Sequence, residues 1–261
     1  MKYPAIDPVL LHLGPLQLRW YGLMYVIGFI CAYLIAVRFA RRRHYAMSRE
    51  QVEDLLFWCI VGVILGGRLG YCLIYNLDFY ASQPLEILKV WHGGMSFHGA
   101  LLGLFVTAWL YARQQGLNFL MVCDIGALAA PPGLFFGRIG NFINAELWGR
   151  VTTVPWGMVF PGAGPLPRHP SQLYESLLEG LALMAILYLV SRKDRPHGAL
   201  IGTFLTGYGC FRFVVEFFRE PDAQMGFIVA GFTMGQILCT LMVLAGTYLL
   251  VRSSRLAGKD R

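Results

Sequence analysis

Long apolar segments separated by short polar connections are the feature that most constrains this chain. Each segment is close to the roughly 20 residues that an α-helix needs to cross about 30 Å of hydrocarbon, and only helices or closed barrels satisfy their backbone hydrogen bonds there. The apolar runs are continuous, unlike the alternating pattern of a membrane barrel. Charged residues make up 14% of the chain, against about 25% in soluble domains. The sequence therefore predicts an all-α polytopic membrane protein.

Seven transmembrane helices are predicted, within a single integral membrane domain that covers residues 1–261. The spans are about 20–39, 52–75, 94–112, 119–138, 173–190, 198–217 and 227–251. Residues 76–93 and 139–172 connect spans on one side of the membrane, and both contain tryptophan and proline. We expect these two segments to form a small extracytoplasmic cap.

The basic residues predict the orientation of the chain. With the N-terminus outside and the C-terminus inside, the inner loops and the tail carry twelve Lys and Arg residues and the outer connections carry six. This bias agrees with the positive-inside rule. The inner group is Arg41, Arg42, Arg43, Arg49, Arg113, Arg192, Lys193, Arg195, Arg252, Arg255, Lys259 and Arg261. The formal charge of +7 is thus a topology signal, and we expect no nucleic-acid partner.

Several polar residues share one depth in this topology, in the outer half of the membrane. They are Tyr21, Arg68, His98, Arg138, Tyr208, Arg212 and Glu216. A charged side chain at the bilayer centre costs ~2.5 to 3.5 kcal/mol even on the insertion scale, so intramembrane ionisable residues indicate a functional site. Two other interpretations remain open: residues 137–150 could be an amphipathic rim at the headgroups, and His98 could be a hydrogen-bonded core residue.

The charges suggest what such a site would bind. Arg212 and Glu216 are four residues apart and Glu216 and Arg219 three apart, which predicts one helical face of alternating charge. Alone, that face is equally a structural ion pair. With Arg138 and Arg68 at the same depth, one glutamate cannot pair every arginine, so we expect surplus positive charge. Guanidinium groups suit phosphate, and a phospholipid headgroup is the most available anion at that depth.

Motifs of other enzyme classes do not occur. His98 has no second histidine four residues on, no HExxH motif and no Asp/Cys cluster beside it, so no metal site is predicted. The sequence also contains no G-x-S-x-G elbow and no P-loop, and no soluble cofactor is expected.

Six stretches together resemble one family closely, the bacterial phosphatidylglycerol:prolipoprotein diacylglyceryl transferases. They are WYGLMY (20–25), GGRLGY (66–71), GGMSFHGALLG (93–103), GRIGNFINAELWGR (137–150), PRHPSQLYE (167–175) and GYGCFRFVVEFFREPDAQ (207–224). They occur in the family's order and extend over most of the chain. The segment between Arg150 and Pro167 looks shorter than in some members, which affects only the details of substrate docking.

The resemblance implies an activity and a place for it. Members of the family transfer the diacylglyceryl group of phosphatidylglycerol to the thiol of the lipobox cysteine in the signal peptide of a prolipoprotein. The transfer forms a thioether and releases glycerol 1-phosphate, as the first step of lipoprotein maturation. The resemblance also implies a multi-pass protein of the bacterial inner (cytoplasmic) membrane, with a periplasmic cap and an active site toward the periplasmic leaflet. Both substrates would reach it from the lipid bilayer.

The resemblance also implies residue roles. Arg138 and Arg212 match the family's essential arginines, and His98 matches its candidate catalytic base. The other matching functional positions are Tyr21, Asn141, Asn144, Glu146, Gly149, Tyr208 and Glu216. We expect the arginines and their neighbours, together with Arg68 at the same depth, to bind phosphatidylglycerol. Either His98 or a carboxylate polarised by an arginine could accept the thiol proton.

Three rival functions fit the sequence less well. A lipid-phosphate transporter should carry a continuous series of polar residues into the inner leaflet, whereas the inner halves of the spans carry few besides Arg38. An intramembrane protease should carry paired Asp, Ser/His or HExxH groups, whereas the well-placed carboxylates are Glu146 and Glu216. A structural scaffold would not explain the shared depth of the charges.

Overall fold

The computed structural model describes residues 1–4, 6–14, 16–42, 44–45, 47–220, 227–229 and 232–259. Arg43, Arg261 and residues 221–224 of the last motif lie outside the described residues. The chain divides into two compact units, Met1–Ala36 with Asp124–Arg261, and Val37–Cys123. Each unit is described by itself.

The chain is mostly helical, and five of its described helical segments are long and apolar enough to cross a membrane. They are Trp20–Ala40 (α1), Arg49–Ile74 (α2), Phe119–Ile143 (α5), Ser171–Val190 and Met234–Leu256 within α9 (Met234–Lys259). Ala199–Val215 (α8) is a shorter apolar helix, and Phe97–Gln114 (α4) covers all but the first three residues of the predicted third span. The protein therefore has the helices of a multi-pass membrane protein, while the count of seven spans and the orientation remain predictions.

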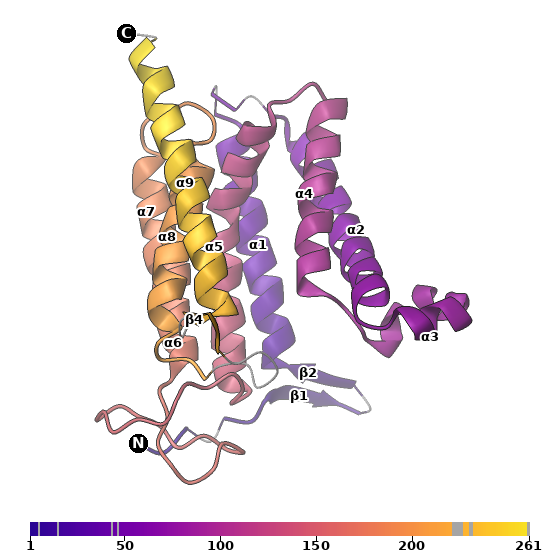
Figure 1. Cartoon of the computed structure of the whole chain (residues 1–261), viewed down its shortest axis with the longest axis vertical. Helices are drawn as coiled ribbons and strands as arrows, with labels where there is room; N and C mark the ends of the chain where they lie inside the picture. The colour runs from indigo at the N-terminus through magenta and orange to yellow at the C-terminus, as the bar shows by residue number, and fades with distance from the viewer. Residues whose placement is uncertain are drawn as a thin grey trace. The chain divides into compact units, whose positions relative to one another are not determined.

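The second unit is built on two helices that lie side by side, α2 and α4 (Figure 1). Their backbones approach closely because glycines face each other. A Cβ atom on Gly66 would lie 2.3 Å from the carbonyl oxygen of Gly99, and one on Gly70 would lie 2.8 Å from the Cα of Gly99. Small residues at such a crossing favour packing between membrane helices. The connection between α2 and α4 contains α3 (Leu77–Ser82) and two 3₁₀ turns, Pro84–Leu88 and Val90–His92.

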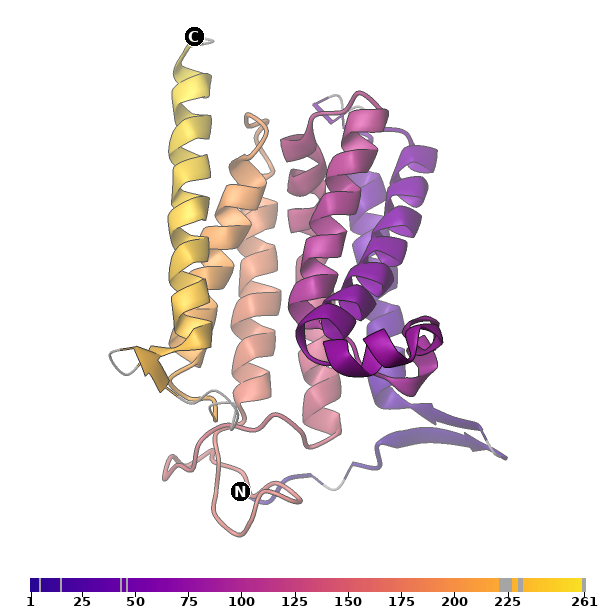
Figure 2. The ribbon, with the colours of Figure 1, turned by 45° about the vertical axis from the view of Figure 1, so that its right-hand side comes forward.

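The first unit packs α8 against α9, which run side by side in both views (Figures 1 and 2). A Cβ atom on Gly246 of α9 would lie 2.7 Å from the carbonyl oxygen of Gly202 of α8, so this crossing too requires glycine. The segment Ser171–Val190 is continuous but irregular: α6 (Ser171–Glu175) leads into a π-helical turn, Ser176–Ala182, and then into α7 (Leu183–Val190).

One predicted span end is wrong. Arg138 was expected to end the fourth span, but α5 continues to Ile143 and passes through Pro131 and Pro132 without a break. Neighbouring helices and local adjustment satisfy the carbonyl groups that a proline frees in membrane helices. Arg138 therefore lies more than a turn inside its helix, where neighbouring helices can reach it.

The chain is mostly helical, as predicted, but two short hairpins depart from the all-α pattern. Val9–Leu13 (β1) and Leu16–Arg19 (β2) form an antiparallel hairpin directly before α1. Phe227–Val229 (β3) also pairs with Phe232–Thr233 (β4), so α9 begins at Met234 and the last span does not begin at Phe227. Phenylalanine, isoleucine and valine favour strands as well as membrane helices, so their hydropathy alone could not show where the helix begins.

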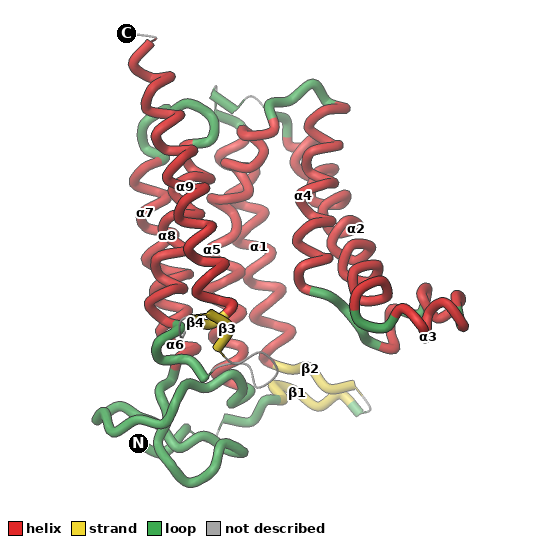
Figure 3. The backbone as a smooth tube through the Cα atoms, viewed as in Figure 1, coloured by secondary structure: helices red, strands yellow, loops and turns green. Residues whose placement is uncertain are grey.

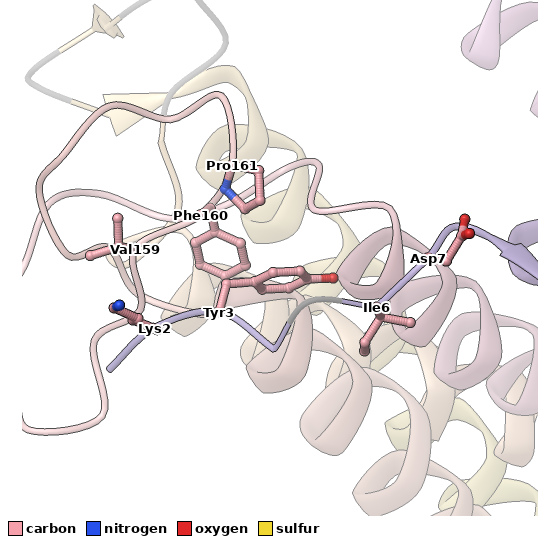
Figure 4. Close-up of a pocket in the computed structure, with 7 residues that line it drawn as sticks. All are labelled: Lys2, Tyr3, Ile6, Asp7, Val159, Phe160 and Pro161. Atoms are coloured by element: carbon pink, nitrogen blue, oxygen red, sulfur yellow. The ribbon is translucent and has the colours of Figure 1, made fainter.

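Loops of the first unit fill the segment 144–170, shown in green in Figure 3. The N-terminal segment is tied to them, because the backbone amide of Val159 donates to the carbonyl of Met1 and the hydroxyl of Tyr3 donates 2.6 Å to the carbonyl of Phe142. Phe160 is buried beside Tyr3. A pocket of about 720 Å³ lies between the two segments (Figure 4). Its lining residues are Lys2, Tyr3, Ile6, Asp7, Val159, Phe160 and Pro161.

Candidate active site

A buried cluster of charged side chains lies in the first unit, centred on Arg212 of α8. Its Nη2 atom lies 2.9 Å from Oε2 of Glu216, as the four-residue spacing predicted. Its Nη1 atom lies 3.4 Å from Oε2 of Glu175 and 3.9 Å from Oε1 of Glu179. All four residues are buried. Arg212 is therefore surrounded by three carboxyl groups.

Arg138 of α5 joins the same cluster through Glu175. Its Nε atom lies 2.6 Å from Oε2 of Glu175, the oxygen that also faces Arg212. One carboxylate thus holds two guanidinium groups, which come from α5 and α8. The side chain of Arg138 is 23% exposed and that of Arg212 10%, so Arg138 is the more accessible of the two. These two arginines, which were predicted to share one depth in the membrane, contact the same carboxylate oxygen.

The expected surplus of positive charge is wrong for this cluster. Glu175 and Glu179 were not among the predicted site residues, although the first ends the PRHPSQLYE motif and the second follows four residues later. Two arginines are in contact with three carboxyl groups, counting Glu216. The missed signal is the spacing itself, because two glutamates four residues apart near the start of an apolar span share one helical face.

Local packing against α5 brings these glutamates to the arginines. The hydroxyl of Ser176 donates 3.2 Å to the carbonyl of Phe135, one turn before Arg138. A Cβ atom on Gly180 would lie 2.6 Å from the Cβ of Phe135, so the π-helical turn can press against α5 only at a glycine. π-helical turns often mark functional sites in helices.

At the end of α5, Arg138 begins a series of polar side chains that are joined by hydrogen bonds. The Nη1 of Arg138 donates 3.4 Å to Oδ1 of Asn141, whose Nδ2 donates 2.8 Å to Oε1 of Glu146. Asn144 Nδ2 reaches the same oxygen at 3.4 Å. Four predicted site residues, Arg138, Asn141, Asn144 and Glu146, are therefore linked by hydrogen bonds.

The turn that forms this chain is strained. Ala145 and Leu147 have φ of 52° and 57°, in the left-handed region that disfavours residues with a Cβ atom. The backbone is held there by Gln172, whose Nε2 donates 2.6 Å to the carbonyl of Glu146. Strain of this kind persists where the surrounding structure enforces it, and often does so at functional sites.

Gly149 and Tyr21 pack closely against the segment that carries these hydrogen-bonded side chains. The amide of Gly149 donates 2.9 Å to the carbonyl of His169, and a Cβ atom there would lie 2.4 Å from the carbonyl oxygen of Phe218. Only glycine permits this approach. Tyr21 in α1 lies against Gly140, where an added Cβ would be 3.0 Å from its ring, and its hydroxyl is 3.0 Å from that of Tyr25.

The predicted helical face around Glu216 is partly wrong. Glu216, the C-cap of α8, keeps its predicted pairing with Arg212, but Arg219 lies beyond the end of the helix, so the face of alternating charge does not extend to it. Oε1 of Glu216 instead accepts a hydrogen bond of 2.9 Å from the hydroxyl of Thr233, just before α9. Tyr208 lies one turn before Arg212 on α8, and its ring stacks on Phe204 at 5.7 Å between centroids.

Two predicted site residues, His98 and Arg68, belong to the second unit. His98 is exposed in the first turn of α4, whose N-cap Ser96 accepts a hydrogen bond of 3.2 Å from the amide of Gly99. Its part in catalysis remains a prediction.

Arg68 in α2 is 3% exposed, and its guanidinium donates to backbone carbonyls of the connection that follows. Its partners are Glu86 at 2.5 Å, Ile87 at 2.9 Å, Lys89 at 3.1 Å, Gly94 at 3.2 Å and Gly93. The five donors of a guanidinium suit such a set of carbonyls. Arg68 thus holds this connection together, and its predicted contact with a lipid remains untested.

The cluster in the first unit contains two guanidinium groups that buried carboxyl groups hold in place. Guanidinium groups stay charged and bind phosphate through paired donors. Nη1 of Arg212 is buried and has no hydrogen-bond partner among the described residues, although two carboxylates lie within 4 Å of it. No group of three His, Cys, Asp or Glu side chains in the described part of the chain is arranged to hold a metal ion.

Comparison with known proteins identifies the family. The sequence model described as prolipoprotein diacylglyceryl transferase matches residues 8–252. A phosphatidylglycerol–prolipoprotein diacylglyceryl transferase of Oleidesulfovibrio alaskensis is 57% identical over 95% of this chain and 94% of its own length. Proteins of the same name from Geobacter sulfurreducens and Pseudomonas paraeruginosa are 56% and 55% identical, each over 98% of this chain, and over 98% and 96% of their own lengths. The chain belongs to the prolipoprotein diacylglyceryl transferase family.

Proposed function

We propose that this protein transfers the diacylglyceryl group of phosphatidylglycerol to the cysteine thiol of a prolipoprotein signal peptide, forming a thioether and releasing glycerol 1-phosphate. The observation that carries the proposal is the pair of guanidinium groups held by one buried carboxylate, Arg138 and Arg212 on Glu175. Its support is the family to which the chain belongs and the names of its relatives.

The reaction requires that a phosphate leave a glycerol carbon as a thiolate attacks it. Preorganised donors directed at the developing phosphate charge lower the barrier of such a step, especially where water is excluded. Arg138 and Arg212 are assigned this role. Asn141, Asn144 and Glu146 hold Arg138 through the hydrogen-bonded chain at the end of α5, and Gly149 and Tyr21 keep that segment in place.

The remaining assignments concern the proton and the membrane. His98, or a carboxylate of the cluster, accepts the proton of the thiol.

The protein crosses the bacterial inner membrane seven times with its N-terminus outside. In this orientation the loops rich in basic residues lie on the inner side. The charged cluster then lies toward the periplasmic leaflet, where the lipid and the lipobox of the signal peptide both arrive within the bilayer.

A transfer assay in detergent micelles tests the proposal. Micelles contain phosphatidylglycerol and a lipobox peptide, and glycerol phosphate release is followed for the wild type, Arg212→Ala and His98→Gln. The matched control is the same peptide with its cysteine replaced by serine. Release that requires the cysteine and falls at least about a hundredfold in Arg212→Ala supports the transferase, because removing one preorganised donor typically costs that much.

The opposite result is equally clear. Release that does not depend on the peptide, or no release from a folded wild-type protein, would overturn the proposal and would favour a lipid-phosphate transporter. His98→Gln then separates the two candidate bases: near-complete loss assigns the proton to the imidazole, and retention assigns it to a carboxylate.

A further inference from the structure

The buried cluster contains more acidic than basic groups in direct contact. Arg138 and Arg212 are always charged, and they face the carboxyl groups of Glu175, Glu179 and Glu216. If all three glutamates were ionised, the contacts would carry one uncompensated negative charge. Burying an unpaired charge is so unfavourable that the group usually takes up a proton instead.

Of the three glutamates, Glu179 has the fewest contacts that would stabilise an ionised carboxylate. Glu175 touches Arg138 at 2.6 Å, and Glu216 touches Arg212 at 2.9 Å and accepts a hydrogen bond from Thr233. Glu179 is 0% exposed, and its nearest cation is Arg212 Nη1 at 3.9 Å. Neither of its carboxyl oxygens has a hydrogen-bond partner among the described residues. An ionised carboxylate would be expected to collect such partners.

Every element around Glu179 contributes charged or titratable groups. It interacts electrostatically with Glu175 on its own segment, with Arg212 and Tyr208 on α8, with Arg138 on α5 and with Cys239 on α9. Glu216 pairs with Arg212. Arg219, beyond the end of α8, adds a more distant positive charge. Glu175 and Glu216 already occupy the nearest sides of the guanidinium groups, so these cations do not compensate a third carboxylate.

We infer that Glu179 is a protonated, neutral carboxyl group in the resting protein and that it positions Arg212 to receive the phosphate of the lipid. This inference rests on the proposed function. An ionised Glu179 would repel the phosphodiester anion and would compete with it for Nη1 of Arg212. A neutral carboxyl at the same place leaves that donor free to bind the phosphate. It also packs beside the guanidinium of Arg212 and so keeps it in position.

Infrared difference spectroscopy tests the protonation state directly. A protonated carboxyl has a carbonyl stretch well separated from that of a carboxylate, and a buried one shifts only slightly in deuterated water. We expect the spectrum of the wild type minus that of Glu179→Gln at pH 7 to contain this band. Glu220→Gln, which changes an exposed glutamate, is the matched control and should give no such band.

Kinetics test the positioning role. We expect Glu179→Ala to release glycerol phosphate at least about tenfold more slowly than the wild type and Glu179→Gln, a neutral group of the same shape, to restore the rate to within about threefold. The pH profile gives a further readout. The wild type should lose activity on the alkaline side as Glu179 loses its proton, and Glu179→Gln should retain activity to higher pH.

The outcomes separate this inference from the proposed function. Absence of the carboxyl band, a Glu179→Gln rate no better than that of Glu179→Ala, an unaffected Glu179→Ala, or an unchanged alkaline limb each overturns the inference while wild-type transfer continues. Failure of the wild type itself overturns the proposed function, and the infrared result still decides the state of Glu179. If Glu179→Ala does not fold, the infrared band and the pH profile of Glu179→Gln decide alone.

Discussion

The carboxylate of Glu175 lies 2.6 Å from the guanidinium Nε of Arg138, and this contact joins α6 to α5 within the candidate membrane-spanning segments. The side chain of Glu175 is 1% exposed, so little water can reach the guanidinium groups in place of its carboxylate. The same oxygen lies 3.4 Å from Arg212 of α8. A single side chain therefore fixes the spacing of the two arginines on which the proposed chemistry depends.

Replacing Glu175 by alanine should therefore destabilise the protein and abolish its activity. Loss of one partner of a buried ion pair leaves the other charge uncompensated and typically costs about 3–5 kcal/mol. We expect a lower unfolding midpoint in detergent and glycerol phosphate release reduced by at least about a hundredfold, because both guanidinium groups lose their common support. Thermal unfolding and the transfer assay measure the two effects.

Glu220→Ala is the control for that variant. Glu220 also pairs with an arginine, at 3.0 Å from Arg168, but its side chain is 50% exposed. Exposed pairs contribute about 0–1 kcal/mol, so this variant should unfold close to the wild type. Equal losses in the two variants would contradict a special role for the Glu175 contact.

The sequence predicted the helices well where lipid alone decides the structure. The predicted first span at 20–39 corresponds to α1 at Trp20–Ala40, because a continuous apolar run in lipid must satisfy its backbone within one helix. It could not predict where the last helix begins, since apolar residues occur on both sides of Met234 and a hairpin precedes it. Strand pairing depends on contacts between segments, which hydropathy does not report.

The site could be predicted only in part, because its contacts also join segments that are far apart in the sequence. Arg138, Arg212 and Glu216 stood out because charges are costly in an apolar segment. Glu175 and Glu179 are equally costly, but they lie near the start of the predicted span 173–190, where charged residues also occur in helices whose side chains point to the headgroups. The ion pairs, and the contact between the π-helical turn and Phe135, show that they turn inward to the arginines.

Gly149→Ala should be destabilising through steric overlap alone. The added Cβ would lie 2.4 Å from the carbonyl oxygen of Phe218 and 2.8 Å from the Cβ of His169, so backbone must move. Overpacking of this kind costs about 1–3 kcal/mol. The midpoint of thermal unfolding should fall, and activity should fall with it, because the turn that holds Glu146 is displaced.

A second glycine variant controls for the loss of glycine itself. Gly126 lies in α5, and an added Cβ there would have no described atom within 4 Å. Gly126→Ala should unfold at the wild-type temperature or higher, since alanine favours a helix by up to about 1 kcal/mol. A Gly126→Ala variant as unstable as Gly149→Ala would refute the steric explanation.

Asp124→Ala should destabilise α8 at its first turn. The buried carboxylate accepts hydrogen bonds of 2.8 Å from the amides of both Gly198 and Ile201, and thereby caps the helix that carries Arg212. Each buried donor left without its partner costs about 1–3 kcal/mol. We expect a lower unfolding midpoint and reduced helical circular dichroism on heating. Ser254→Ala, which removes an exposed hydroxyl in α9, should change stability by no more than about 0.5 kcal/mol.

The stability of the loop segment should depend on pH through His169. Burial lowers the pKa of this imidazole below its usual value of about 6.5. Its Nδ1 lies 3.1 Å from the hydroxyl of Tyr174, which accepts a hydrogen bond of 2.7 Å from Nε1 of Trp156. The Tyr174 hydroxyl can then donate to a neutral His169. Protonation of Nδ1 would remove that acceptor.

The sign of the effect follows from the two states. The unfolded chain binds the proton at a higher pH than the folded chain, so folding is favoured above a pH of about 6.5 and the contribution is lost as the pH falls below it. The unfolding midpoint of the wild type should drop between pH 7 and pH 5 by more than that of His169→Gln, whose side chain does not titrate in this range. The difference between the two curves isolates His169 from other titrating groups, and parallel curves would show that its protonation is not coupled to folding.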